Sequence, residues 1–157
     1  LNIATLTIVG HNNGARQFGR IKETYKLSLL YGCAIATLGF FFLFLFPSQL
    51  MGLFSSDSAV VSTGSTYLRI AAFVEWAYVI LFVTVSMLQG LKRPLFAILL
   101  GLFRQVIAPL IVFWLLGTVL GLGLLGVWWG IFIVMWLSTG ISLLYARFVL
   151  RSMHVLN

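Results

Sequence analysis

The chain has 157 residues, of which 61% are apolar and 8% are charged, whereas about a quarter of the residues in a soluble domain are charged. This composition excludes a soluble globular domain and predicts an all-α integral membrane protein. The formal charge of +7 does not indicate nucleic-acid binding, because almost all of the Lys and Arg residues fall between apolar segments, where they direct membrane topology.

The first residues look like the end of a helix whose start is missing. The chain begins at Leu1 without Met, and we therefore expect residues 1–10 to be the end of a helix in a longer protein. Glycines and asparagines predict a turn at residues 10–15. The basic segment 16–26 has apolar residues at three- and four-residue spacing, which predicts an amphipathic helix at the headgroup level.

Four apolar segments have the length of a transmembrane helix. The first of them rises about 28 Å if it is helical, which suffices to cross the hydrocarbon core. Before the second, Ser55, Ser56 and Asp57 predict the N-cap of a short helix that leads into it. The expected spans are residues 28–46, 70–90, 95–116 and 124–146.

The distribution of basic residues predicts how these spans are oriented. Lys and Arg cluster in 11–26, in 91–94 and in the C-terminal tail 147–157, whereas the connections 47–66 and 117–123 contain none. If each span crosses once, the three basic segments lie on one side, which the positive-inside rule makes cytoplasmic. We expect a multi-pass protein of the cell's inner or plasma membrane, in contact with the lipid bilayer.

One acid, Glu75, lies inside the second span. On a helix, Tyr78, Ser86 and Gln89 fall within about 60° of it, so most polar side chains of the span share one face. An ionisable residue inside a membrane is costly and is by default a candidate for function. Two interpretations remain open: Glu75 binds a proton, a cation or a substrate, or it is a protonated acid in a packed helix interface.

The third span contains the cation Arg104. Its Cα is expected to differ in depth from that of Glu75 by roughly 8–10 Å, which leaves open a strained salt bridge or a structural role for the arginine. Pro109 predicts a kink, because it cannot donate to the carbonyl of Gln105. Gln105 is a further candidate for contact with substrate or solvent.

The remaining features favour packing over chemistry. The sequence contains no HExxH, Walker A or GxSxG motif, and its lone Cys33 provides neither a disulfide nor a cysteine metal site. We therefore expect no enzyme, no metal site and no cofactor. Gly126 and Gly130 form a GxxxG pair typical of helix packing, and Trp136 has the position of a core residue or a ligand-stacking residue.

Four segments in this order are similar to motifs of one transporter family. Residues 8–24 (IVGHNNGARQFGRIKET) are similar to its VGQ-N-GAG segment, and residues 88–94 (LQGLKRP) to its LRG-x-x-x-P helix exit. LFSSD at 53–57 and YLRI at 67–70 lie between them. The chain thus resembles the C-terminal part of a multidrug and toxic compound extrusion (MATE) family transporter.

The resemblance implies a fold and a mechanism. The chain would hold the end of helix eight and helices nine to twelve of a twelve-helix protein, and its N-terminal lobe would be missing. Two bundles would rock around a central cleft, with export coupled to H⁺ or Na⁺ and no other cofactor. Glu75 falls about one turn closer to the outer end than the family's best-known acid on this helix, where Tyr78 stands.

Three functions remain as alternatives. The first is export of small amphipathic or cationic compounds, because the acid lies among aromatic residues. The second is a flippase for lipid-linked saccharides with the same architecture. The third is a structural membrane subunit that transports nothing.

Overall fold

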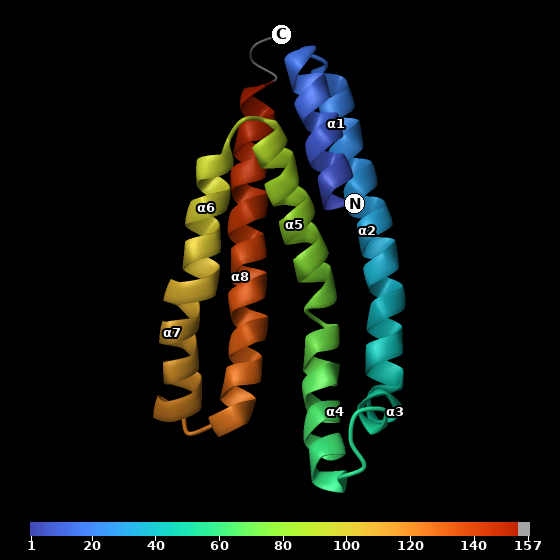
Figure 1. Ribbon diagram of the computed structural model, residues 1–157. Coiled ribbons are helices and arrows are strands. Elements are labelled where there is room, and N and C mark those ends of the chain that lie inside the picture. The colour runs from blue at the N-terminus through green and yellow to red at the C-terminus, as the bar shows by residue number, and fades with distance from the viewer. Residues whose placement is uncertain (154–157) are drawn as a thin grey trace.

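The computed structural model describes residues 1–153, none of which lies in a strand (Figure 1). The last four residues of the expected basic tail, 154–157, lie outside the described residues. The elements in chain order are α1 (Asn2–Gly14), α2 (Phe18–Leu45), α3 (Pro47–Gly52), α4 (Ser58–Ala72), α5 (Glu75–Gly90), α6 (Pro94–Leu102), a π-helical segment (Phe103–Ile107), α7 (Ala108–Phe113), a second π-helical segment (Trp114–Val119) and α8 (Gly123–Ser152).

The helices confirm the predicted all-α membrane class. Three of them, Phe18–Leu45, Pro94–Val119 and Gly123–Ser152, are long and apolar enough to cross a bilayer. α4 and α5 together make a fourth candidate, if the bent pair is one span.

Proline and aspartate side chains mark several helix starts. Pro47 and Pro94 stand in the first turns of α3 and α6, where the missing N–H of proline costs no helical hydrogen bond. The predicted cap of α4 is Asp57, whose Oδ1 accepts a hydrogen bond of 2.8 Å from the backbone N–H of Ala59.

The first two helices are longer than expected. α1 continues to Gly14, through most of the expected turn at 10–15. α2 joins the amphipathic segment to the span in one helix of 28 residues. Tyr25 and Ile21 explain this continuity, because both are buried in the same core as Val9 of α1 and so keep the basic segment helical and packed.

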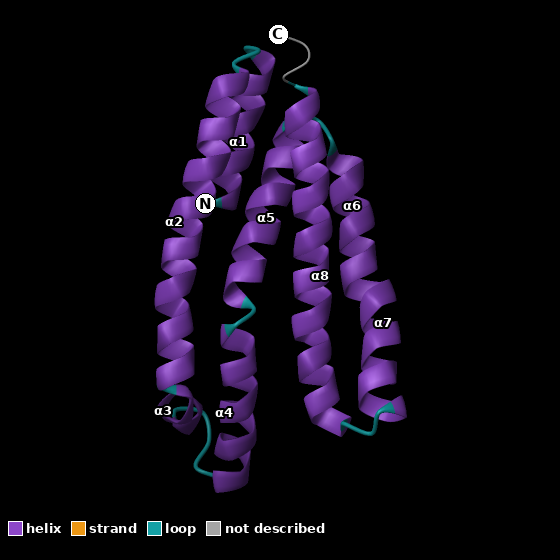
Figure 2. Cartoon of the chain, turned by 180° about the vertical axis from the view of Figure 1, so that it is seen from behind, coloured by secondary structure: helices purple, strands orange, loops and turns teal. Residues whose placement is uncertain are grey.

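The second expected span, 70–90, is not one straight helix. The chain breaks at Phe73 and Val74, and α4 and α5 meet there at a bend of 46° (Figure 2). No proline or glycine occurs between Ala71 and Glu75, so no helix-breaking residue marks the bend locally.

The irregularity expected at Pro109 takes the form of a π-helical turn. Within Phe103–Ile107 the helix is wider, and the N–H of Ala108 donates to the carbonyl of Phe103, five residues back. A second such turn follows at Trp114–Val119. The first of these turns redistributes backbone hydrogen bonds just before the proline, which has no N–H to donate.

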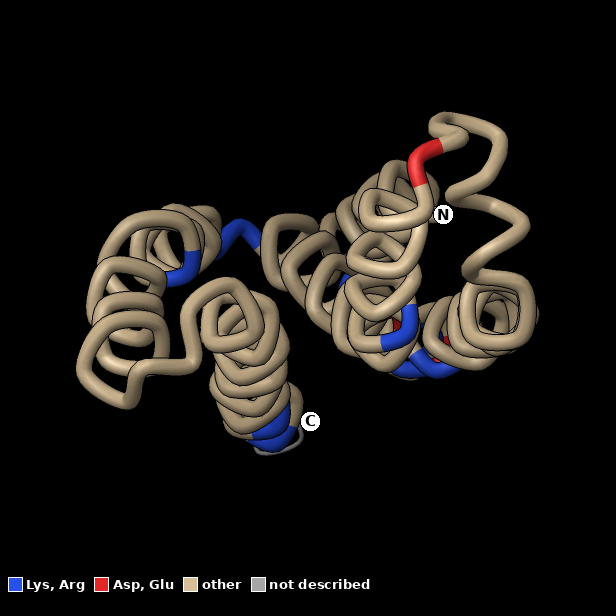
Figure 3. The backbone as a smooth tube through the Cα atoms, turned by 90° about the horizontal axis from the view of Figure 1, so that it is seen from below, with Lys and Arg blue, Asp and Glu red and all other residues tan. Residues whose placement is uncertain are grey.

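α5 is the element around which the others pack. It contacts α1 and α2 on one side and α6 and α8 on the other (Figure 1). Two buried polar contacts fix these neighbours: the hydroxyls of Tyr25 and Thr84 lie 2.8 Å apart, and Thr139 donates to the carbonyl of Ala77 at 3.0 Å. Seen along the helix axes, charged positions are sparse on the backbone (Figure 3).

The basic segments gather at one end of the molecule. The α1–α2 turn, the α5–α6 turn and the described end of α8 all lie at the top of Figure 1. α3 and the α7–α8 turn lie at the opposite end. All three basic segments can therefore face the same compartment.

Candidate functional site

The break between α4 and α5 places Glu75 at the first position of α5. Its side chain is partly buried, and within the described part of the chain no hydrogen bond or ion pair reaches its carboxylate. The positive end of the α5 dipole favours an acid at this position. The carboxylate lines a cavity of about 120 Å³ together with Tyr67, Ile70, Ala71, Val74, Tyr78, Trp128 and Ile131.

α8 donates hydrogen bonds to the backbone at the bend. The indole Nε1 of Trp136 donates to the carbonyl of Phe73 at 3.2 Å, and this carbonyl lies where α4 has ended. One turn away, Thr139 donates to the carbonyl of Ala77. The sequence predicts core packing or ligand stacking for Trp136; the structure instead shows that its indole binds the backbone at the break.

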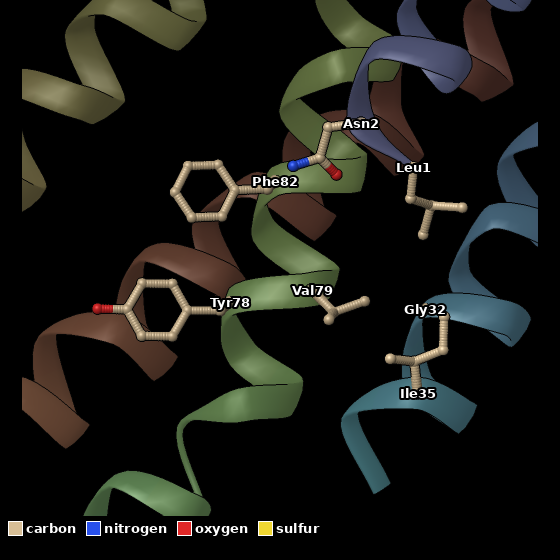
Figure 4. A pocket seen from close by; sticks show the side chains of 7 residues that line it. All are labelled: Leu1, Asn2, Gly32, Ile35, Tyr78, Val79 and Phe82. Atoms are coloured by element: carbon tan, nitrogen blue, oxygen red, sulfur yellow. The ribbon is translucent and has the colours of Figure 1, made fainter. Parts of the chain in front are cut away.

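Two aromatic rings continue the surface from Glu75 along α5. The rings of Tyr78 and Phe82 are stacked, with centroids 5.9 Å apart and planes at 6°. Each residue is 37% exposed, so the stack offers accessible aromatic surface. Both side chains leave α5 on the side away from Gly32 and Ile35 (Figure 4).

The stacked rings of Tyr78 and Phe82 border three cavities. Tyr78 lines both the cavity of Glu75 and a cavity of about 220 Å³ next to α1 and α2, whose wall includes Asn2 and Ile35. Phe82 lines this second cavity and a third of about 60 Å³. The cavities therefore adjoin at the two rings.

Arg104 lies at the third cavity. Its guanidinium carbon is 5.5 Å from the centre of the Phe82 ring, a cation–π distance, and its Nη1 lies 3.5 Å from the sulfur of Met135 on α8. Thioether sulfur is a weak acceptor, and no carboxylate of the described residues pairs with the cation. An arginine at the centre of a bilayer costs roughly 2.5–3.5 kcal/mol on insertion scales, so this cation is energetically unfavourable in the isolated chain.

We call Glu75, Tyr78, Phe82 and Arg104 the α5 cleft. Glu75 and Arg104 do not form an ion pair, because Arg104 lies beside Phe82, which is seven residues, or roughly 10 Å, along α5 from Glu75. This separation agrees with the depth difference expected from the sequence.

The other candidate residues lie elsewhere. Ser86 is buried one turn beyond Phe82, and Gln89 is exposed near the basic end of α5. Gln105 is exposed and lines a separate cavity on α7 with Pro109 and Trp114, so the structure does not bring it to Glu75.

Several residues of the site were not found from the sequence. Tyr67 and Trp128, whose ring centroids are 5.7 Å apart, close the Glu75 cavity from α4 and α8. Their side chains look like interfacial aromatic residues in the sequence, so composition alone does not mark them. Among residues 1–153, no group of His, Cys, Asp and Glu side chains is suited to hold a metal ion.

Comparisons with known proteins agree with this architecture. The MatE family model matches residues 1–115. The chain is 28% identical over 153 residues to the probable multidrug resistance protein NorM of Pseudomonas syringae pv. tomato, a match that covers 93% of this chain and 33% of that protein. The chain thus spans about a third of the length of this curated relative.

Two solved structures share the fold. One is the inward-facing conformation of a multidrug resistance MATE family transporter of the MOP superfamily, with a TM-score of 0.90, 22% identity and coverage of 98% of this chain and 36% of that one. The other is an outward-facing conformation of such a transporter, with a TM-score of 0.90, 21% identity and coverage of 98% and 34%. With the family model matched over well over half of its length, the chain belongs to the MatE family.

Proposed function

We propose that the chain is the C-terminal part of the second lobe of a secondary active transporter, which exports small amphipathic or cationic compounds. Transport proceeds by alternating access and is driven by an H⁺ or Na⁺ gradient. The basic segments face the cytoplasm, and the N-terminal lobe of the same protein closes the open side of the α5 cleft.

One observation carries this proposal: an acid without a protein partner lines a cavity at a break in a membrane span. A carboxylate in this position can take up a proton or a cation and release it again, because no arginine or lysine of the described residues neutralises it. The break exposes it beside aromatic rings, which suit an amphipathic cation through both apolar contact and cation–π attraction.

The relatives support the direction and mechanism of transport. The relative from Pseudomonas syringae is a probable multidrug resistance protein, which agrees with export of small molecules by this chain's full-length protein. The TM-score is 0.90 against both an inward-facing and an outward-facing transporter, so this arrangement of helices is compatible with both states. This is the behaviour expected of a lobe that rocks as a unit.

Efflux from vesicles tests the proposal. The complete transporter is reconstituted in proteoliposomes, and loss of a cationic fluorescent dye is followed under an imposed H⁺ gradient, an Na⁺ gradient or neither. We expect dye movement that depends on one of the two gradients. Dye movement equal with and without both gradients contradicts secondary active transport, and no dye movement under any condition favours the flippase or the non-transporting subunit.

A further inference from the structure

The guanidinium of Arg104 is the one charged group of the α5 cleft that ion coupling does not use. Arg104 is only partly buried, and its contacts are the Phe82 ring and the Met135 sulfur, neither of which is an anion. An arginine carries five N–H donors, so most of its donors have no partner among the described residues.

The surroundings favour an added anion. The cavity beside Arg104 is lined otherwise by apolar side chains and glycine, and such a low-dielectric lining strengthens any charge pair formed there. Its lining comprises Leu81, Phe82, Val85, Ala97, Leu100 and Gly101. The Phe82 ring holds one face of the guanidinium, and a planar guanidinium binds carboxylates and phosphates through its edge.

A second polar group without a partner within residues 1–153, Ser138, lies on α8. Ser138 is fully buried, and its hydroxyl has no hydrogen-bond partner within the described part of the chain. It stands three residues after Met135, the residue that contacts Arg104, and therefore within about 60° of the same helix face.

We propose that Arg104 binds an anionic group of the exported molecule, either a carboxylate or a phosphate. This inference rests on the proposed function. Glu75 lies roughly 10 Å away along α5, and the Tyr78–Phe82 stack lies between the two charges. The preferred substrate class is therefore an aromatic amphiphile that carries an anionic group as well as a cationic one. The cleft selects such molecules over cations of the same size.

A pair of dyes that differ only in the anion tests this inference. Rhodamine B carries a cationic ring system and a free carboxylate, and its ethyl ester carries the cation alone. Binding of each dye is measured with the purified complete transporter in neutral phosphatidylcholine nanodiscs. We expect the wild-type protein to bind the acid more tightly than the ester by about tenfold, as one desolvated charge pair predicts.

Variants of the arginine identify the residue responsible. We expect Arg104→Gln to weaken binding of rhodamine B about tenfold and binding of the ester less than about twofold, and Arg104→Lys to restore part of the preference. Arg20→Gln, the same change at an exposed position of α2, should alter neither dye. Equal losses for both dyes, or no loss for either, would overturn the inference and leave Arg104 a structural residue. The preference of the wild-type protein for the acid tests it even if Arg104→Gln does not fold.

Two further measurements complete the test. The first distinguishes a substrate anion from a lipid phosphate, and the second distinguishes failure of the anion site from failure of the transport function. If a lipid phosphate occupies the site, adding phosphatidylglycerol to the nanodiscs will abolish the preference of wild-type protein for the acid, which overturns the assignment to substrate. If the transporter binds rhodamine B through Arg104 but exports neither dye under any ion gradient, the anion site stands and the proposed transport function fails.

Discussion

At the residue scale, Glu75 and Arg104 carry opposite charges in one cleft without meeting. The acid lies at the start of α5, and the cation lies beside Phe82 two turns along it. Each is left without an oppositely charged partner in the described residues, which a purely structural pair would not be. Among the remaining polar side chains of α5, Thr84 is hydrogen-bonded to Tyr25 and packs α5 against α2.

Trp136 gives the first prediction. Trp136→Phe keeps an aromatic ring but removes the N–H that donates to the Phe73 carbonyl at the bend. We expect a loss of about 1 kcal/mol in the free energy of unfolding, the net value of one hydrogen bond. The measurement is reversible unfolding of the complete protein in detergent.

Trp114→Phe is the matched control for that prediction. Trp114 is 62% exposed and lies on the third span, away from the Phe73 carbonyl, so its replacement should change stability by less than about 0.5 kcal/mol. Equal losses in the two variants would show that the hydrogen bond of Trp136 does not hold the bend.

At the element scale, α8 supports the site through close approach to its neighbours. A Cβ at Gly126 would lie 2.6 Å from the backbone of Leu116, and one at Gly130 would lie 2.6 Å from the Phe113 ring. The GxxxG pair therefore packs against the end of the third span within the same chain, as a small-residue motif allows. This contact fixes the position from which α8 reaches the bend.

These glycines give the second prediction. Gly126→Ala should destabilise the protein by about 1–3 kcal/mol, because the methyl group would press on backbone that cannot move aside. Gly140→Ala, on the same helix with open space at its Cβ, should stabilise it by up to about 1 kcal/mol through helix propensity. Thermal unfolding of both variants in one detergent checks the prediction, and a gain in stability for Gly126→Ala would be contrary to it.

Hydropathy was sufficient to predict the helices, but not the bend. Three of the four long apolar segments became long helices, the fourth became the bent pair α4 and α5, and the Asp57 cap followed from a local side-chain preference. At the bend, the Phe73 carbonyl accepts from a donor on α8, a partner more than sixty residues away that no local pattern indicates. For the same reason, helical periodicity placed Glu75 and Tyr78 on one face correctly but did not predict Tyr67 and Trp128 around them.

At the scale of the whole molecule, the basic turns at one end indicate the orientation of the chain in the membrane. They comprise the α1–α2 turn and the α5–α6 turn, with the end of α8 beside them (Figure 1). Membrane proteins place such segments in the cytoplasm.

Gln105 does not reach the α5 cleft, although its neighbour Arg104 does. The two side chains lie on different faces of the helix, because successive residues differ by about 100°.

Cysteine labelling in intact cells gives the third prediction. With Cys33→Ala as background, Gln17→Cys lies at the basic end and Ser56→Cys at the opposite end, and both positions are exposed. A membrane-impermeant maleimide added outside should label Ser56→Cys alone and reach Gln17→Cys only after permeabilisation. The reverse pattern would place the basic segments outside.

Gradient-driven export by a Glu75→Gln variant tests the central claim most directly. In proteoliposomes of the complete transporter, removal of the charge should lower ion-driven dye export by about tenfold or more, since the neutral amide cannot exchange a proton and offers a cation no negative charge. Glu23→Gln, which makes the same change at an exposed position, should leave export near the wild-type rate. An unchanged rate and an unchanged pH dependence in Glu75→Gln would contradict the assignment of Glu75 as the coupling residue.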